Sequence, residues 1–523
     1  MTDSPTDASS PSSGAGPANA QERRDADVSH AARSGAMQVV TILGQGLLPL
    51  AHILIARLFG TVVFGAYQGT LAFVEMATRG GTGGADKAML RYIAGFRGRG
   101  DASSEASALG TGLRLCVSVA LPLAIGLMLG APLLARLLHE PELATALPAM
   151  APAVLFTALV YVLVQASLGA KVTRANFLVR GLGEPGFFLL AGLGAALISR
   201  DLRTLAIAHS TAALATLCLA LIVVGRVFGA RRLGAAMRAP RLSGFAGFSL
   251  PMGGSEMLNA VLQRADIVML TAFAGARSAG IYAAAEFLCR IVANIRYAFD
   301  SIAAGVLSEA YHRNERERLR HNLALMTRWV VSVAAPMAVL AVVFRRFLLG
   351  LYGPDFAAGA TAMLILAASH FINASLGLAP WLLMVSGRSR LLLVDNLACA
   401  GLNILLGLLL IPRFHIVGTA IAVLCTIAAY QGLMLWQTWR AERVHPFELR
   451  LVRPLVAAAL MLAAMRLASP WLGHGAWGLL LLVGGIGFYL AVLLLLGLPP
   501  EEKTLLAKLR ARLRREAPPA TGC

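Results

Sequence analysis

Seven charged side chains lie inside two apolar segments, where charge is costly. The segments cover residues 246–270 and 279–305, and each is long enough to cross a bilayer as a helix of about 20 residues. A charge at the bilayer centre costs about 2.5–3.5 kcal/mol, so such residues normally face a partner or a hydrated cavity. The seven are Glu256, Arg264, Asp266, Glu286, Arg290, Arg296 and Asp300.

Helical spacing gathers most of these charges on one face of each segment. At about 100° per residue, an arc of about 160° on the second segment holds Glu286, Arg290, Asn294, Arg296 and Asp300. An arc of about 80° on the first segment holds Glu256, Asn259, Gln263 and Asp266, and Arg264 lies outside it. This pattern predicts a hairpin that lines a hydrated pathway. The structural alternative is mutual neutralisation, since Glu286 and Arg290, and likewise Arg296 and Asp300, are four residues apart.

The composition places these helices in a membrane. Hydrophobic residues make up 57% of the chain, charged residues 14%, and the mean hydropathy is +0.70, whereas soluble domains carry about 25% charged residues. The fold class predicted is therefore an all-α polytopic membrane protein. The six cysteines are scattered singly, so the sequence indicates neither a zinc site nor a disulfide framework.

Motifs for catalysis do not occur in the sequence. We find no Walker A, GxSxG or HExxH pattern, and we expect no metal, no cofactor and no enzymatic activity. The loops between apolar segments are short, which argues against a membrane-embedded ligase or polymerase. The net charge of +19 would suit nucleic acid, but the basic residues follow membrane topology instead.

Fourteen apolar segments are predicted, the first at 36–58 and the last at 475–497. With the N-terminus in the cytoplasm, most of the 46 Lys and Arg residues fall in inner loops, as the positive-inside rule requires. Both termini are then cytoplasmic. Basic loops also suit contact with anionic lipid headgroups.

An internal repeat divides the chain into two lobes. Residues 64–67 (FGAY) match 279–282 (AGIY), and residues 117–122 (VSVALP) match 331–336 (VSVAAP), both at an offset of about 215. An even number of segments separates the matches, so the halves share one orientation and a substrate pathway is expected between them. The domains predicted are a disordered cytoplasmic tail (1–33), an N-lobe of six helices (34–230), a basic linker (231–245), a C-lobe of six helices (246–440), two added helices (450–498) and an amphipathic basic cytoplasmic tail (499–523).

The repeat predicts a polar face on the first segment as well. Gln45 and His52 share a face of about 60° there, Glu75 on the second segment is the facing candidate, and Arg57 lies near the outer end. Helix–helix hydrogen bonding is the structural alternative for this stripe. Because the first segment lacks acidic residues, we expect most of the cationic binding capacity on the second lobe.

Several motifs resemble the polysaccharide-flippase branch of the multidrug/oligosaccharidyl-lipid/polysaccharide exporter superfamily. They lie at 83–94 (GGADKAMLRYIA), 263–266 (QRAD), 280–282 (GIY), 403–406 (NILL), 411–412 (IP) and 417–422 (VGTAIA). The resemblance covers residues 35–440. It implies a two-lobed carrier of the bacterial inner membrane that moves undecaprenyl-diphosphate-linked oligosaccharides by alternating access. Implied partners are the lipid-linked oligosaccharide, membrane lipids, a polysaccharide polymerase and glycosyltransferases.

The resemblance also implies roles for the charged residues. Cationic cavity residues would hold the pyrophosphate, which suits Arg264, Arg290 and Arg296, because guanidinium binds phosphate oxygens with two hydrogen bonds. Glu286 and Asp300 would balance these charges and couple transport to H⁺ or Na⁺. Two alternatives stay open, an ion-coupled multidrug or cation exporter and a flippase for the peptidoglycan lipid precursor.

Overall fold

Every regular element in the described part of the chain is a helix, which confirms the all-α prediction. The computed structural model describes residues 47–313, 315–386, 389–472 and 477–497. Both predicted tails, 1–33 and 499–523, lie outside these ranges.

The N-terminal half of the described chain contains α2 (Leu47–Gly81), α3 (Ala85–Gly98), α4 (Ala102–Leu137), α5 (Leu143–Met150), α6 (Pro152–Gly169), α7 (Thr173–Asn176), a π-helical turn (Phe177–Gly183), α8 (Glu184–Ile198), α9 (Leu202–Phe228) and α10 (Ala230–Ala236). The second half contains α11 (Phe245–His312), α12 (Arg316–Val343), α13 (Arg345–Tyr352), a 3₁₀ turn (Pro354–Gly359), α14 (Ala360–Leu376), α15 (Ala379–Val385), α16 (Ser389–Glu442), a 3₁₀ turn (Leu449–Leu451), α17 (Val452–Leu472) and α18 (Trp477–Leu495).

Several helices reverse direction without a loop. Non-helical backbone angles occur at Gly60 in α2, at Gly275 in α11 and at His415 in α16. Ten helices of the described chain are long and apolar enough to span a membrane, and Leu480–Leu495 is a shorter apolar helix. The predicted segments 246–270 and 279–305 leave residues 271–278 for a turn; a single glycine at φ 78° suffices, because glycine adopts positive φ without a steric penalty. The number of fourteen crossings stays a prediction.

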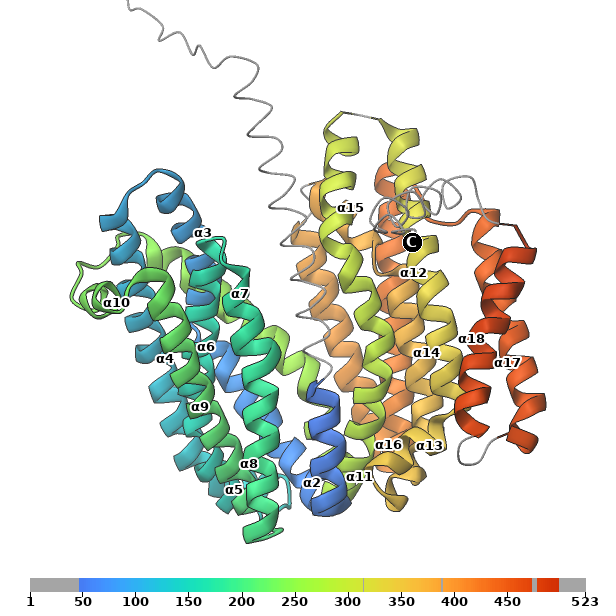
Figure 1. Ribbon diagram of the computed structural model, residues 1–523, viewed down its shortest axis with the longest axis horizontal. Coiled ribbons are helices and arrows are strands. Elements are labelled where there is room, and N and C mark those ends of the chain that lie inside the picture. Colours follow the sequence, from blue (N-terminus) through green and yellow to red (C-terminus); the bar gives the residue numbers. More distant parts are fainter. Residues whose placement is uncertain (1–46, 314, 387–388, 473–476, 498–523) are drawn as a thin grey trace, which may run out of the picture.

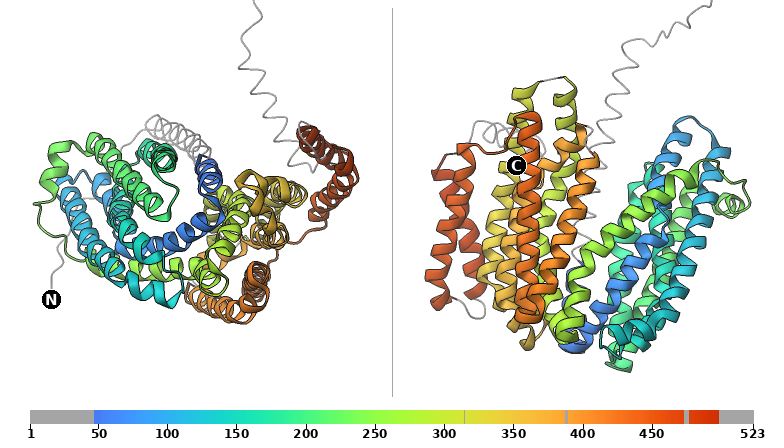
Figure 2. Two further views of the ribbon diagram at one scale, coloured as in Figure 1. Left: turned by 90° about the horizontal axis from the view of Figure 1, so that it is seen from below. Right: turned by 180° about the vertical axis from the view of Figure 1, so that it is seen from behind.

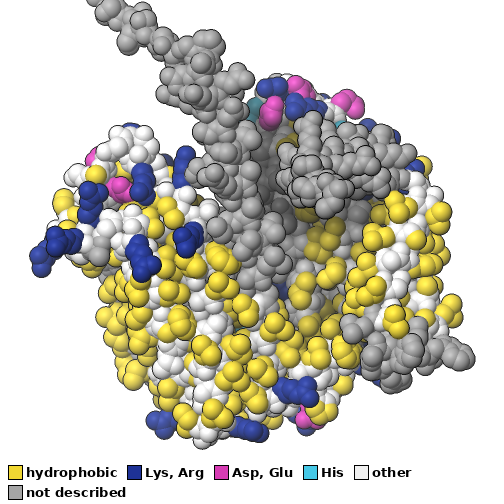
Figure 3. Space-filling model, in the orientation of Figure 1, with side chains coloured by type: hydrophobic (Ala, Val, Ile, Leu, Met, Phe, Trp, Pro, Cys, Tyr) yellow, Lys and Arg dark blue, Asp and Glu magenta, His cyan; other side chains and the backbone are white. Residues whose placement is uncertain are grey.

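The helices form two lobes that lean apart (Figures 1 and 2). The N-lobe holds α2 to α9, with α2 on its inner side, the C-lobe holds α12 to α16, and α11 lies between them. Helices α17 and α18 pack on α12 at the edge of the second lobe. The loops predicted to face inward, around α3, α7 and α10, share one end, where Lys and Arg gather (Figure 3), and we name it the basic end. A largely apolar surface lies between this end and the other.

The lobes meet at the opposite end around a pair of glycines. An added Cβ on Gly65 would lie 1.7 Å from the carbonyl oxygen of Ala276, and one on Gly280 would lie 2.4 Å from that of Thr61. The two contacts are equivalent, because Gly65 and Gly280 are 215 residues apart and so are Thr61 and Ala276. The breaks at Gly60 and Gly275 have the same separation. The sequence repeat is therefore a structural repeat whose two copies cross here.

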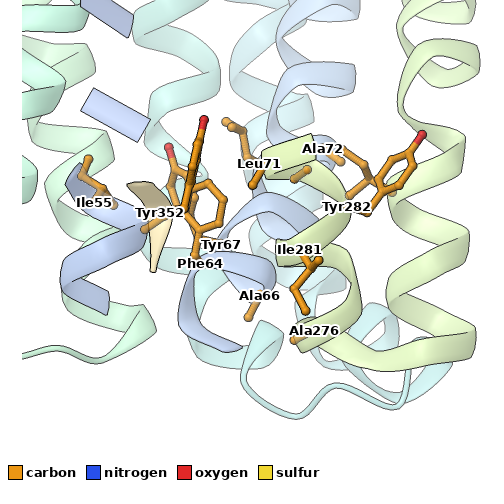
Figure 4. Close-up of a cluster of buried hydrophobic side chains, with 14 of the residues drawn as sticks. Ile55, Phe64, Ala66, Tyr67, Leu71, Ala72, Ala276, Ile281, Tyr282 and Tyr352 are labelled. Carbon is orange, nitrogen blue, oxygen red and sulfur yellow. The ribbon is translucent and has the colours of Figure 1, made fainter. Parts of the chain in front are cut away.

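A single apolar cluster seals this closed end. It includes Phe64 and Tyr67 from α2, Ile281 and Tyr282 from α11, and Tyr352 from α13 (Figure 4). Between α4 and α5, Glu140 accepts a hydrogen bond of 2.7 Å from the backbone N–H of Ala276, which the break at Gly275 leaves without an intrahelical partner. Burial raises the pKa of the Glu140 carboxyl, and that hydrogen bond opposes the shift.

The first half of α11 lies along the N-lobe rather than the C-lobe (Figure 2). Phe245 is part of the N-lobe core, the Ser249 hydroxyl donates to the Gly83 carbonyl at 2.8 Å, and Lys87 pairs with Glu256 at 3.4 Å. The predicted C-lobe begins with this segment, so α11 connects the two lobes. The predicted domain boundaries stay a proposal.

The glycine crossing makes a stability prediction. Gly65→Ala should lower the free energy of unfolding by about 1–3 kcal/mol, because the new methyl group meets backbone that has no space to yield. Gly126→Ala in α4 is the matched control, since open space surrounds it. Thermal unfolding in detergent measures both; equal melting temperatures for the two variants would contradict the close crossing.

Candidate functional site

A cavity of about 560 Å³ lies between the lobes, and its walls come from α2, α6, α8, α9 and both halves of α11. Its charged and imidazole-bearing lining residues are His52, Glu75, Arg79, Arg180, Glu184, His209, Glu256, Arg264, Glu286 and Arg290. Along α2 the lining runs from Tyr67 near the closed end to Arg79 near the basic end, about 18 Å at the helical rise. The cavity is therefore a shaft, and its chemistry changes with depth.

Carboxylates and cations pair within this shaft. Arg264 on α11 donates from Nε to Glu75 on α2. Glu286 accepts from Arg290 at 3.1 Å and lies 2.8 Å from Nε2 of His370 on α14. Such pairing lets charged side chains persist in a low-dielectric environment, where an unpaired ion is expensive.

One tyrosine on the N-lobe lies against two arginines. The guanidinium carbons of Arg79 and Arg180 lie 4.8 and 4.6 Å from the centroid of the Tyr161 ring, within cation–π range. Arg180 also lies 3.7 Å from Glu184. Among the described residues, no carboxylate lies within 4.0 Å of Arg79, which makes its charge the most available to an anion.

The floor of the shaft is aromatic and carries no carboxylate. His52 lies between Phe188 and Phe287, with centroid distances of 5.3 and 4.7 Å, and its Nδ1 donates to the Leu48 carbonyl at 2.9 Å. The Tyr67 hydroxyl is 2.9 Å from Nδ1 of His209. The floor thus offers hydrogen bonds and ring surface, without the charge of the upper levels.

The structure brings many of the predicted site residues together. The cavity lining includes His52, Glu75, Glu256, Asn259, Gln263, Arg264, Glu286 and Arg290. The Glu286–Arg290 pair forms as the spacing indicated. Arg264, which lay outside the predicted arc, also faces the cavity, because this half of α11 runs along the N-lobe and meets Glu75 there.

Other predicted residues lie elsewhere. Arg57 is exposed near the break at Gly60, and Asn294 is exposed on α11. Arg296 donates to the Gly377 carbonyl at 2.9 Å, where α14 ends. Asp266 accepts from the Tyr282 hydroxyl at 2.6 Å, within the α11 hairpin. None of the four is among the residues that line the cavity. Gln45 and the side chain of Asp300 lie outside the described residues.

Sequence reasoning missed the cations of the N-lobe part of the site. Arg79 and Arg180 count as inner-loop charges under the positive-inside rule, yet both line the cavity. The lining arginines do not favour the second lobe, because α2 and the π-helical turn supply two of the four; where most of the cationic binding capacity lies stays a prediction. The available signal was Arg180 inside the apolar run 176–198, four residues before Glu184.

A model of the polysaccharide biosynthesis protein family matches residues 33–304. The chain belongs to this family. No curated protein matches it.

Solved structures share the fold of this family member at low sequence identity. The lipid II flippase MurJ, in an inward closed conformation, matches with a TM-score of 0.68 and 13% identity, covering 87% of this chain and 97% of MurJ. An inward-facing multidrug resistance MATE transporter of the MOP superfamily matches with a TM-score of 0.65 and 11% identity, covering 77% and 98%. A MOP superfamily transporter from Pyrococcus furiosus matches with a TM-score of 0.55 and 12% identity, covering 79% and 95%. The fold is that of the MOP transporters.

Cysteine labelling tests on which side of the membrane the cavity opens. In a chain whose native cysteines are replaced by alanine, Asn259→Cys should react with a membrane-impermeant thiol reagent added on the side of the basic end, because Asn259 lines the cavity. Leu258→Cys is the control. It is 40% exposed but not part of the lining, so lipid should shield it. Labelling of Asn259→Cys from the opposite side alone would contradict the arrangement.

Proposed function

We propose that this protein is a flippase that moves undecaprenyl-diphosphate-linked oligosaccharides across the bacterial inner membrane for surface polysaccharide biosynthesis. The observation that carries the proposal is the arginine-lined cavity between two lobes in a chain of the polysaccharide biosynthesis family. The positive-inside rule makes the basic end cytoplasmic. The lobes diverge at that end (Figure 1), as suits a carrier that receives its cargo from the cytoplasm.

The cavity arginines suit the pyrophosphate of such a cargo. Arg264 and Arg290 are each paired with a carboxylate, so a pyrophosphate would have to exchange with Glu75 or Glu286 to reach them. Arg79 and Arg180 lie nearer the basic end and would meet the cargo first. In this proposal the glutamates hold the arginines in place while the cavity is empty, and Glu286 with His370 is the candidate site for coupling to H⁺ or Na⁺.

Arg79 should contribute directly to anion affinity. Arg79→Ala removes a charge without leaving a carboxylate unpaired, so the fold should be unaffected. A charge-assisted hydrogen bond contributes about 1.5–3 kcal/mol, which corresponds to a rise in the Kd of a prenyl diphosphate of about tenfold to a hundredfold. Isothermal titration in detergent measures this Kd. Arg99→Ala, on the exposed α3–α4 turn, should leave the Kd unchanged, and an unchanged Kd for Arg79→Ala as well would count against the arginine site.

Arg290 should be required for transport. Arg290→Ala is expected to abolish glycan export while the protein still inserts, because it removes a cavity cation and leaves Glu286 with His370 alone. Fluorescent lipid-linked oligosaccharide in proteoliposomes reports translocation. The control is Arg277→Ala, at the opposite end, where the exposed Arg277 lies 3.8 Å from the exposed Asp355. Normal translocation by Arg290→Ala would refute the assigned role.

A flippase for the peptidoglycan lipid precursor is the second candidate. The fold match to a lipid II flippase covers more of this chain than the MATE matches do, and that cargo also carries a pyrophosphate. The same proteoliposomes loaded with lipid II separate the two cargoes. An exporter of organic cations is disfavoured, because each of the four cavity glutamates already has a cationic partner, whereas Arg79 has no carboxylate within 4.0 Å among the described residues.

A further inference from the structure

A small side pocket opens off the central cavity inside the N-lobe. It has a volume of about 40 Å³ and lies between α6, α8 and α9. It shares Thr157, Glu184, Phe188 and His209 with the cavity, and Ala212 and Ala213 are part of its lining. Anything bound in the shaft therefore has access to it, from Glu184 beside Arg180 down to Phe188 and His209 at the floor.

The polar groups of this pocket form a specific donor and acceptor set. The Tyr67 hydroxyl and Nδ1 of His209 are 2.9 Å apart, and we assign Tyr67 as the donor, with the neutral His209 ring as the acceptor. The ring hydrogen of His209 then sits on Nε2, the nitrogen left to donate to a ligand. Glu184 supplies a carboxylate acceptor, and Thr157 supplies a hydroxyl.

The size of the pocket limits what enters it. One water needs about 10–15 Å³ of such volume, so the pocket holds about three water-sized groups. Phe188, Ala212 and Ala213 give it an apolar boundary. A single hydroxyl would leave most of it unfilled, and a carboxylate would meet the like charge of Glu184. A short, uncharged group with one donor, one acceptor and a methyl end fits best.

We propose that this pocket binds an acetamido substituent on a sugar of the lipid-linked glycan and thereby sets glycan specificity. The inference rests on the proposed flippase function and identifies its substrate class more closely. The amide N–H donates to Glu184, the amide carbonyl accepts from Nε2 of His209, and the methyl group contacts the alanines and Phe188. Sites built to hydrogen-bond a substrate group discriminate strongly against analogues that lack it, because their own polar groups are then left unpaired.

The test compares two cargoes in proteoliposomes. Two prenyl-diphosphate-linked disaccharides differ only in acetamido or hydroxyl at one ring position of the sugar next to the diphosphate. The wild-type protein should move the acetamido cargo at least tenfold faster. Ala213→Leu fills the pocket and should remove this preference by slowing the acetamido cargo alone, since Ala213 is not part of the central cavity lining.

A second variant tests the pocket independently, in case Ala213→Leu does not fold. Thr157→Val removes only the hydroxyl and should reduce the preference severalfold. Thr211→Val is its control, because Thr211 on α9 is exposed and lines neither cavity. Equal transport of both cargoes by the wild-type protein would overturn the pocket assignment and leave the flippase proposal intact. Transport of neither cargo would overturn both.

Discussion

Charge inside a membrane is the constraint on which this structure depends. An unpaired ion there is expensive, so each glutamate of the cavity has a cation close by. Two of these pairs, Glu75–Arg264 and Lys87–Glu256, connect α11 to the N-lobe, and the Glu286–His370 contact connects α11 to α14. The same interactions that make the charges tolerable therefore hold α11 between the lobes. The anionic cargo proposed for this protein would compete with them, which would link binding to the contacts between helices.

At the closed end, glycine residues allow two helices to pack closely. Two helices that cross backbone to backbone need residues without side chains, and Gly65 and Gly280 fill the equivalent positions of the two repeats. The contact at these glycines is backbone to backbone, so it depends on shape. Nearby, the breaks at Gly60 and Gly275 let each hairpin reverse within the same layer. The repeat in the sequence thus has a structural meaning, since the equivalent crossings hold the two hairpins together at one point.

The sequence was most informative where local spacing decides the outcome. Apolar length predicted the helices, the short repeated motifs predicted the two-lobed repeat, and four-residue spacing predicted Glu286–Arg290. It failed where distant chain segments decide. Arg296 donates to a carbonyl at the end of α14, 81 residues away, and an ideal helical wheel could not reveal that neighbour. Arg180 lies in a π-helical turn, where the angle per residue changes, so a wheel with 100° spacing does not report its direction.

The residues that line the cavity change with depth, and this change determines which lobes a bound cargo would contact. Along α2, Glu75 and the floor residue Tyr67 are about 12 Å apart, so in the proposed function a pyrophosphate bound among the arginines would leave the attached sugars within reach of the floor. There His52 and Phe188 come from the N-lobe helices, whereas Phe287 comes from the second half of α11. A sugar that reaches this level touches both lobes at once, next to the glycine crossing. The charged residues would then bind the pyrophosphate, and the uncharged residues at the floor would contact the glycan next to the closed end.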